Sequence, residues 1–175
     1  WSLLKEKFGL SQPVEELMDM EADGQCEIAA ARSLAPISGI IPLIDDLLQP
    51  GIRRVIASSS PRRLVETVLQ KTGLNTFFKK SVTGDEVDAG KPDPEIFIKA
   101  ADLVCVPPAQ CLVIEDSPHG IAGAHAAAMK AAGYQNPDSG DQDLTEADLV
   151  IPDFDYVIEN KERIFKTHSC YNNIR

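Results

Sequence analysis

The chain has 175 residues, of which 43% are hydrophobic and 25% charged, which suits one full-sized globular domain with a small appendage. No stretch approaches the roughly 18 consecutive apolar residues of a membrane helix, so we expect no membrane partner. The 17 Lys and Arg residues against 27 Asp and Glu residues give a net charge of −10, which disfavours nucleic acid because such a surface repels phosphate backbones. The four cysteines, Cys26, Cys105, Cys111 and Cys170, form no CxxC pair and indicate a reducing, cytoplasmic compartment.

The first part of the chain has the apolar spacing of helices. Residues 1–34 follow this pattern, and Ser11 with the proline two positions later is a signal for the start of a second helix. The Pro and Gly residues of segment 35–39 then end the helical pattern. We therefore expect two antiparallel helices in a domain over 1–36 and a second domain over 37–175.

The second domain alternates short apolar runs with helical patterns. The expected strands are 55–57, 81–83, 112–114 and 149–151. The expected helices are 44–48, 64–69, 94–104, a segment reaching about residue 129, and 157–165. We interpret 136–143 as a polar surface loop. Short, uniformly apolar strands between helices predict an α/β fold with a parallel sheet covered on both faces and a ligand site at the carboxyl ends of its strands.

Three polar clusters follow expected strands, and the first is Ser58-Ser59-Ser60-Pro61. Such a run is typical of a helix N-terminus, where a serine hydroxyl caps the first turn and a proline occupies it. A hydroxyl and free backbone N–H groups at a helix N-terminus also form an anion site. The residues alone leave both interpretations open.

The second cluster is Gly-Lys-Pro-Asp-Pro at 90–94. One interpretation is a solvated turn that leads into a helix. The other is a binding loop, because the flanking prolines stiffen the backbone and would hold the ammonium group of Lys91 at a fixed point. A phosphate oxygen is a natural partner for that group.

The third cluster is Glu115-Asp116-Ser117, directly after the apolar strand at 112–114. Adjacent carboxylates at the end of a buried strand repel each other and lose hydration unless a positive charge lies nearby. A hard cation such as Mg²⁺ would supply that charge. The alternative is that Asp116 caps the next helix.

The order and spacing of these clusters resemble a known design. Ser58 after its strand, Lys91 in Gly-Lys-Pro-Asp-Pro-Glu-Ile-Phe, and the segment Glu-Asp-Ser-Pro-His-Gly-Ile-Ala-Gly-Ala from Glu115 resemble the second, third and fourth motifs of the haloacid dehalogenase-like (HAD) hydrolase superfamily. The resemblance is closest to the β-phosphoglucomutase-like and phosphoglycolate phosphatase-like branch and covers about 37–158. It implies a Rossmann-like parallel sheet core, the HAD fold, preceded over 1–36 by the C-terminal part of a helical cap.

The resemblance also implies roles for individual residues. The family splits phosphate esters through an aspartyl-phosphate intermediate, with a second Asp as acid and base two residues after the nucleophile. It makes Ser58 a hydrogen-bond donor to the transferring phosphoryl group, helped by the backbone N–H of Ser59. Lys91 would neutralise the phosphate, Asp116 would bind Mg²⁺ directly, and Glu115 would be a ligand or one water removed. Charge and positioning of this kind account for most of phosphoryl-transfer catalysis.

The sequence departs from the family at the first motif. No Asp-x-Asp-Gly follows a strand upstream of Ser58, and the imitation Glu-Ala-Asp-Gly at 21–24 lies in a helical pattern and starts with Glu. The chain also begins with Trp1 rather than Met. We therefore expect the nucleophile and the front of the cap on an N-terminal segment outside this sequence. The core would then lack its first, central strand and contain an open hydrophobic slot with unpaired backbone groups.

The leading functional hypothesis is a Mg²⁺-dependent phosphatase or phosphomutase acting on a small phosphorylated metabolite such as a sugar phosphate. The alternative is a catalytically inactive HAD-like protein that binds phosphate through Ser58 and Lys91 and a metal at Asp116. A dehalogenase is disfavoured because expelling a halide from carbon needs no metal. Phosphatase and mutase are not separated by these motifs, and the oligomeric state is open.

A smaller departure is Ala128, where the family usually has the Gly that closes the helix. A left-handed residue at this position would suit Gly better by about 1 kcal/mol. We expect this difference to affect stability more than chemistry.

Overall fold

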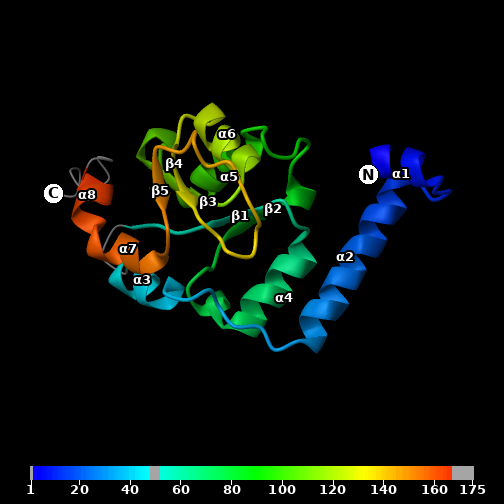
Figure 1. Cartoon of the computed structure of the whole chain (residues 1–175), viewed down its shortest axis with the longest axis horizontal. Coiled ribbons are helices and arrows are strands. Elements are labelled where there is room, and N and C mark those ends of the chain that lie inside the picture. The colour runs from blue at the N-terminus through cyan, green and yellow to red at the C-terminus, as the bar shows by residue number, and fades with distance from the viewer. Residues whose placement is uncertain (1, 48–51, 167–175) are drawn as a thin grey trace.

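The computed structural model describes residues 2–47 and 52–166 (Figure 1). The helices are α1 (Ser2–Phe8), α2 (Val14–Ala31), α3 (Ile40–Asp46), α4 (Arg62–Thr72), α5 (Glu95–Val104), α6 (Pro118–Ala126), α7 (Phe154–Glu159) and α8 (Lys161–Lys166). The strands are β1 (Ile56–Ser58), β2 (Ser81–Thr83), β3 (Leu112–Glu115), β4 (Lys130–Tyr134) and β5 (Leu149–Ile151). None of the helices in these ranges is both long and apolar enough to span a bilayer. Cys170 lies outside the described residues.

The strands pair in parallel, which confirms the predicted α/β class. Within the described residues they form two separate sheets, β1-β2 and β3-β4-β5. The expected strands at 55–57, 81–83, 112–114 and 149–151 are present within one residue of their predicted bounds. The sheet is therefore of the predicted kind, but it is divided between β1 and β3.

Helices cover both faces of the larger sheet, as predicted (Figure 1). The α5 and α6 side chains pack with Ala131 and Val113 on one face, whereas α3, α7 and α8 pack with Ala132 and Leu112 on the other. Neighbouring residues of β3 and β4 thus belong to opposite cores, as the two-residue period of a strand requires. Both faces of this half are consequently buried.

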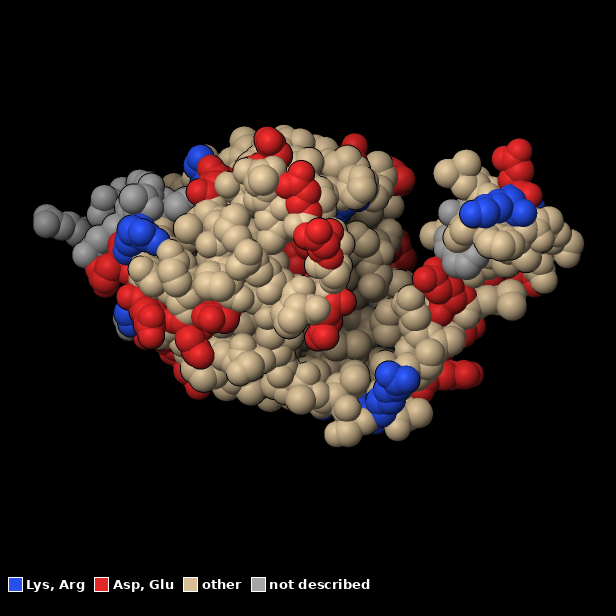
Figure 2. Space-filling view, viewed as in Figure 1, with Lys and Arg blue, Asp and Glu red and all other residues tan. Residues whose placement is uncertain are grey.

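The two expected N-terminal helices are formed, and α2 packs along α4. Arg63 of α4 pairs with Asp19 and Asp23 of α2. Ser11 is not the predicted cap, because the N-cap residue of α2 is Pro13 and no side chain caps it. In Figure 2 a hollow separates the tip of this helical pair from the body, and acidic side chains dominate the charged surface in view. The hairpin is therefore attached mainly through α4.

The sequence analysis missed β4. Helix α6 ends at Ala126, not near residue 129, and Ala128 adopts the left-handed conformation (φ 58°) that returns the chain into the strand. The strand sequence Lys-Ala-Ala-Gly-Tyr has no β-branched residue, so the pattern did not predict a strand. Small residues are required here, because a Cβ on Gly133 would lie 3.0 Å from the Cβ of Ala147.

Two helices also differ from their predicted bounds. The helix expected at 44–48 is α3, which begins four residues earlier, and residue 48 lies outside the described ranges. The closing helix expected at 157–165 is divided into α7 and α8, with Asn160 as the C-cap residue of α7. Neither change alters the layer that these helices form.

Candidate active site

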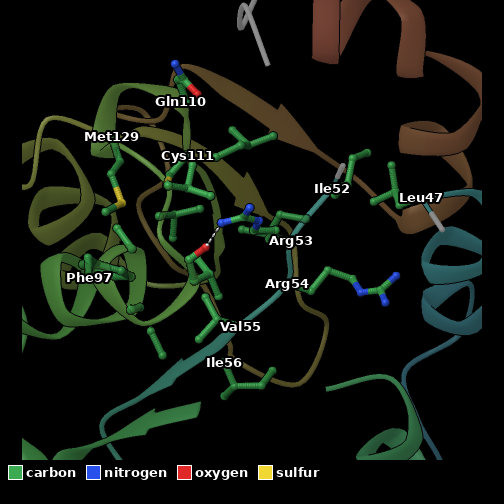
Figure 3. Close-up of a pocket in the computed structure, with 18 of the residues that line it drawn as sticks. Leu47, Ile52, Arg53, Arg54, Val55, Ile56, Phe97, Gln110, Cys111 and Met129 are labelled. Atoms are coloured by element: carbon green, nitrogen blue, oxygen red, sulfur yellow. Dashed lines mark hydrogen bonds between the residues drawn. The ribbon is translucent and has the colours of Figure 1, made fainter. Parts of the chain in front are cut away.

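A cavity of about 660 Å³ lies where the sheet is divided, between β1 and β3 (Figure 3). Its lining is mostly apolar, and its labelled members in Figure 3 include Val55, Phe97 and Met129. Arg53 also lines the cavity, and it donates hydrogen bonds to the carbonyl oxygens of Val104 (2.5 Å) and Cys105 (2.9 Å). The cavity therefore separates the two sheets, and the absence of a central strand from the core stays a prediction.

Both strands that border the cavity have one edge facing it. The Ile56 N–H donates to Lys80 O on the β2 side, so the alternation of a strand directs the Ala57 backbone groups toward the cavity. On β3, Cys111 O accepts the Lys130 N–H on the β4 side, which by the same alternation directs Leu112 and Ile114 toward the cavity. Two parallel strand edges thus face each other across the cavity.

Lys91 joins the two halves at the carboxyl ends of these strands. Its ammonium group donates to Ala57 O at the end of β1 (3.2 Å) and forms an ion pair with Glu115 at the end of β3. The Lys91 and Glu115 side chains are only 12% and 11% exposed, and Nζ lies 4.9 Å from the centroid of the Phe97 ring. The interpretation of 90–94 as a freely solvated turn is therefore wrong for the lysine side chain.

Glu115 organises the start of α6. Its Oε1 faces Lys91, and its Oε2 accepts hydrogen bonds from the Asp116 N–H (3.1 Å), the Ser117 N–H (3.2 Å) and the Ser117 hydroxyl (3.0 Å). Gly120 leaves room for this carboxylate, since a Cβ there would lie 2.0 Å from Glu115 Cδ. Glu115 is thus held by one cation, three donors and a glycine.

Asp116 is not a helix cap, so the capping alternative is wrong. The N-cap of α6 is Ser117, whose Oγ accepts the Gly120 N–H at 3.0 Å. Asp116 Oδ2 instead accepts hydrogen bonds from Asn136 Nδ2 (2.7 Å) and Ser139 Oγ (2.5 Å). Burial acts to raise the pKa of Asp116, but these two hydrogen bonds and the charge of Lys91 outweigh it, and the pKa lies below its ordinary value. Asp116 is therefore a carboxylate at neutral pH.

The predicted Mg²⁺ ligands offer only part of a coordination shell. The described residues contain no group of three or more His, Cys, Asp or Glu side chains arranged to hold a metal ion. Asp116 Oδ1 accepts no hydrogen bond from any other described residue, whereas both oxygens of Glu115 are engaged. A carboxylate oxygen that accepts no hydrogen bond from another described residue suits a hard cation whose other ligands come from water, substrate or further chain. The Asp116 carboxylate is therefore compatible with Mg²⁺, and the metal contacts of both Asp116 and Glu115 stay predictions.

The serine cluster forms a tight turn after β1. Ser58 Oγ accepts the Ser60 N–H (3.2 Å), and Ser60 O accepts the Gly84 N–H (3.0 Å). Gly84 lies under this turn, since a Cβ there would be 2.1 Å from Ser59 O. None of the serines caps α4. The backbone N–H of Arg62, the first residue of α4, instead donates to the two oxygens of the Asp85 carboxylate, at 3.2 and 3.3 Å. No described residue accepts the hydroxyl hydrogen of Ser58, which can therefore be donated to a ligand.

The structure brings most of the predicted site residues to one edge of the sheet. Lys91 contacts Glu115 directly and reaches Ala57, the neighbour of Ser58, while Asp116 follows Glu115 in the chain. Ser59 is exposed on the same turn as Ser58. Their predicted contacts with phosphate are untested.

Four contributors to this edge were missed from the sequence: Gly84, Gly120, Asn136 and Ser139. Asn136 and Ser139 lie in the segment interpreted as a surface loop, which in fact begins at the carboxyl end of β4. Recognition of β4 as a strand would have made Asn136, a polar residue just after it, a candidate site residue, because ligand sites lie at the carboxyl ends of parallel strands. Gly84 gave no signal in the sequence, and the fourth motif includes Gly120 without revealing that it makes room for Glu115.

Comparisons with known proteins agree with this arrangement. A family model described as haloacid dehalogenase-like hydrolase matches residues 4–128. Protein CbbY of Rhodobacter capsulatus is 30% identical over 143 residues, which cover 80% of this chain and 63% of CbbY. Validoxylamine A 7'-phosphate phosphatase of Streptomyces hygroscopicus subsp. limoneus is 29% identical over 154 residues, covering 84% of this chain and 72% of that protein.

Solved structures show the same fold. β-Phosphoglucomutase of Clostridium difficile superposes with a TM-score of 0.66 at 26% identity, covering 75% of this chain and 57% of that one. A HAD hydrolase of family IA, variant 3, from Entamoeba histolytica gives a TM-score of 0.77 at 24% identity, covering 94% and 78%. The chain spans 63% of CbbY and 50% of a HAD-like hydrolase domain-containing protein of Arabidopsis thaliana. From its motifs, its fold and these matches, the chain belongs to the haloacid dehalogenase-like hydrolase family, in the family IA branch that includes CbbY and β-phosphoglucomutase.

Proposed function

We propose that this chain provides the phosphate-binding and metal-binding part of a Mg²⁺-dependent phosphatase or phosphomutase for a small phosphorylated metabolite such as a sugar phosphate. The observation that carries the proposal is the position of Lys91. Its ammonium group lies between the carboxyl ends of β1 and β3, where it contacts Ala57 O and Glu115, two residues that line the apolar cavity. A cation held at the carboxyl edge of a parallel sheet is suited to an anionic substrate.

The nucleophile in this proposal comes from a segment outside the sequence. An extended apolar segment between β1 and β3 would satisfy the two inward edges and fill the 660 Å³ cavity. If it runs parallel to its neighbours, its carboxyl end emerges beside Lys91. An Asp placed there would be next to the cation and the Ser58 hydroxyl.

The proposed reaction transfers a phosphoryl group twice. An Asp carboxylate oxygen attacks phosphorus, the bond from phosphorus to the substrate oxygen breaks, and that oxygen takes a proton from the second Asp. Water, losing its proton to the same Asp, then attacks the phosphorus, which releases inorganic phosphate and restores the carboxylate. In a mutase, a hydroxyl on another carbon of a sugar phosphate takes the place of water and gives a sugar bisphosphate, which then returns its original phosphoryl group to the nucleophilic Asp. Lys91 and the Ser58 hydroxyl would stabilise the phosphoryl oxygens during both transfers.

Asp116 would hold the Mg²⁺ ion through Oδ1. When bound, the ion would supply positive charge against the phosphoryl oxygens and the nucleophile. Glu115 would bind the ion directly or through one water, from a position fixed by its contacts with Lys91 and Ser117. The relatives support a phosphorylated substrate, since one is named for a validoxylamine phosphate and another for β-phosphoglucose.

The test uses the full-length natural protein. Phosphate release or isomer formation is measured with a hexose 6-phosphate, a β-hexose 1-phosphate and a pentulose bisphosphate, with Mg²⁺ and with EDTA. In parallel, the reaction is quenched in acid and reduced with borohydride, and the modified Asp is located by mass spectrometry. The proposal expects Mg²⁺-dependent turnover and a modified Asp on a segment preceding this sequence.

The alternative, an inactive binding protein, predicts a different result. The same protein would bind inorganic phosphate and lose that binding in Lys91→Ala, yet it would give no turnover and no modified Asp. Turnover that is unaffected by EDTA and by Lys91→Ala would contradict both functions.

A further inference from the structure

The two oxygens of the Asp116 carboxylate have different environments. Oδ2 accepts two hydrogen bonds, from Asn136 Nδ2 (2.7 Å) and Ser139 Oγ (2.5 Å). Among the described residues, no other residue donates a hydrogen bond to Oδ1. One oxygen is thus occupied by protein donors, while the lone pairs of the other are left for a ligand.

The direction of these hydrogen bonds follows from the side-chain chemistry. Asn136 Nδ2 also donates to Ser139 Oγ at 2.7 Å, so the serine hydroxyl is already an acceptor there. A hydroxyl carries one hydrogen, and this hydrogen is then directed at Asp116. Both residues therefore donate to the carboxylate, and an ionised carboxylate accepts both.

The loop that carries Asn136 and Ser139 is ordered by its own hydrogen bonds. Asn136 Oδ1 accepts the Asp138 N–H (3.1 Å), and Asn136 O accepts the Ser139 N–H (3.2 Å). Gln142 Nε2 donates to Ser139 O at 2.7 Å. The two donors are consequently held in place before any ligand binds, and they need no rearrangement to reach Asp116.

We infer that Asn136 and Ser139 are positioning residues that orient Asp116 so that Oδ1 binds the divalent cation. This inference rests on the proposed function, because it requires the cation at Asp116. Carboxylates that bind metal ions are usually hydrogen-bonded by outer residues, and loss of such a partner typically costs about 10- to 100-fold in metal affinity. Donors on Oδ2 alone favour contact through a single oxygen.

A merely structural role is the competing explanation, since the same hydrogen bonds tie the loop to Asp116, the residue that follows β3. Gln142→Ala separates the two, because Gln142 stabilises this loop through Ser139 O without touching Asp116. Ser139→Thr keeps the hydroxyl and is the conservative rescue. Ser139→Ala and Asn136→Ala each remove one donor to Asp116.

The experiment measures Mn²⁺ binding to the full-length protein without substrate, by electron paramagnetic resonance of the free ion, together with the melting temperature without metal. Ser139→Ala and Asn136→Ala are expected to weaken Mn²⁺ binding about 10-fold or more. Ser139→Thr should bind nearly as the natural protein does. Gln142→Ala should lower the melting temperature and leave the Mn²⁺ affinity unchanged.

Asp116→Asn distinguishes failure of the inference from failure of the proposed function. If Asp116→Asn loses Mn²⁺ while Ser139→Ala and Asn136→Ala keep full affinity, the positioning role is wrong and the metal site stands. If Asp116→Asn binds Mn²⁺ normally, or the natural protein binds none, the proposed metal site is wrong and the inference falls with it.

Discussion

The two halves of the sheet contribute to the site edge in different ways. The β3-β4-β5 half presents carboxylates that are fixed by side-chain hydrogen bonds, with Glu115 held by Ser117 and Asp116 held by Asn136 and Ser139. The β1-β2 half presents a serine turn that is ordered mainly by backbone contacts with Gly84. Between the halves, the carboxyl edge is bridged by Lys91.

This difference indicates which parts of the site are complete. The carboxylates of the larger sheet have their supporting contacts in place, so we expect metal binding to depend on that half. The serine turn follows Ala57, which lines the cavity and whose carbonyl oxygen accepts a hydrogen bond from Lys91. A catalytic site needs groups that are held in position before the reaction. We therefore expect the final geometry of the serine turn to depend on what fills the cavity.

Removal of the Lys91 side chain, which bridges the two halves, should have the largest effect. Lys91→Ala in the full-length protein is expected to lower kcat about 10²- to 10³-fold, because a charge directed at the transferring group is lost. It should also destabilise the fold by about 3 kcal/mol, since Glu115 would be left buried without its cation. Lys99→Ala is the control, because Lys99 pairs with Glu95 on the exposed side of α5. Steady-state kinetics and urea unfolding measure both quantities, and near-normal turnover in Lys91→Ala would remove the lysine from the mechanism.

Gly120→Ala should have the second-largest effect, on the half of the site that belongs to the β3-β4-β5 sheet. The added methyl would overlap the Glu115 carboxylate, so the ion pair with Lys91 must shift, and we expect a loss of about 1–3 kcal/mol and at least about 10-fold in kcat/KM. Gly24→Ala is the matched control, because it adds a methyl to a helix with nothing within 4 Å and should stabilise by about 0.5–1 kcal/mol. Equal behaviour of the two variants in thermal unfolding would show that Glu115 is not confined as described.

Gly84→Ala tests the smaller half in the same way. A Cβ at this position would collide with Ser59 O, so the turn that presents Ser58 must move. We expect inorganic phosphate to bind about 10-fold more weakly while Mn²⁺ affinity is unchanged, since the metal site lies on the other half. Gly90→Ala adds a methyl in open space on the lysine loop and should change neither affinity. A parallel loss of both affinities in Gly84→Ala would mean that the halves are not independent.

Ala128→Gly should have the smallest effect and the opposite sign. Ala128 has a φ of 58°, where glycine is not strained, and we expect stabilisation by about 0.5–1 kcal/mol with unchanged kinetics. Ala126→Gly, at the end of α6, is the control and should destabilise by a similar amount. Chemical denaturation of the pair measures the difference, and destabilisation by Ala128→Gly would contradict the left-handed conformation.

The sequence predicted those parts of the fold that rest on strong local patterns. Apolar runs such as 112–114 and the polar residues after them identified four strands and the edge where Lys91 and Asp116 lie. The order and spacing of three motifs also identified the family. These features could be predicted because strand pattern, turn chemistry and motif spacing agree along the chain.

The rest depended on tertiary contacts that no local pattern encodes. The strand β4 has small residues because both of its faces are buried, and its composition resembles the end of a helix. Asn136 was interpreted as solvated because the strand before it was not recognised. The contact of Glu115 with Lys91 joins residues 24 positions apart, and neither residue type specifies it.

The central claim is that a strand from outside this sequence occupies the cavity between β1 and β3 and brings the nucleophile to Lys91. Amide hydrogen exchange of the full-length protein, resolved by NMR, tests it at the Ala57, Leu112 and Ile114 amides, which face the cavity. The Ile56 and Lys130 amides, which bond within the two sheets, are the internal references. We predict that the three cavity-facing amides are protected to the same degree as the references, because each would pair with the added strand. Rapid exchange at Ala57, Leu112 and Ile114 beside protected references would contradict the claim.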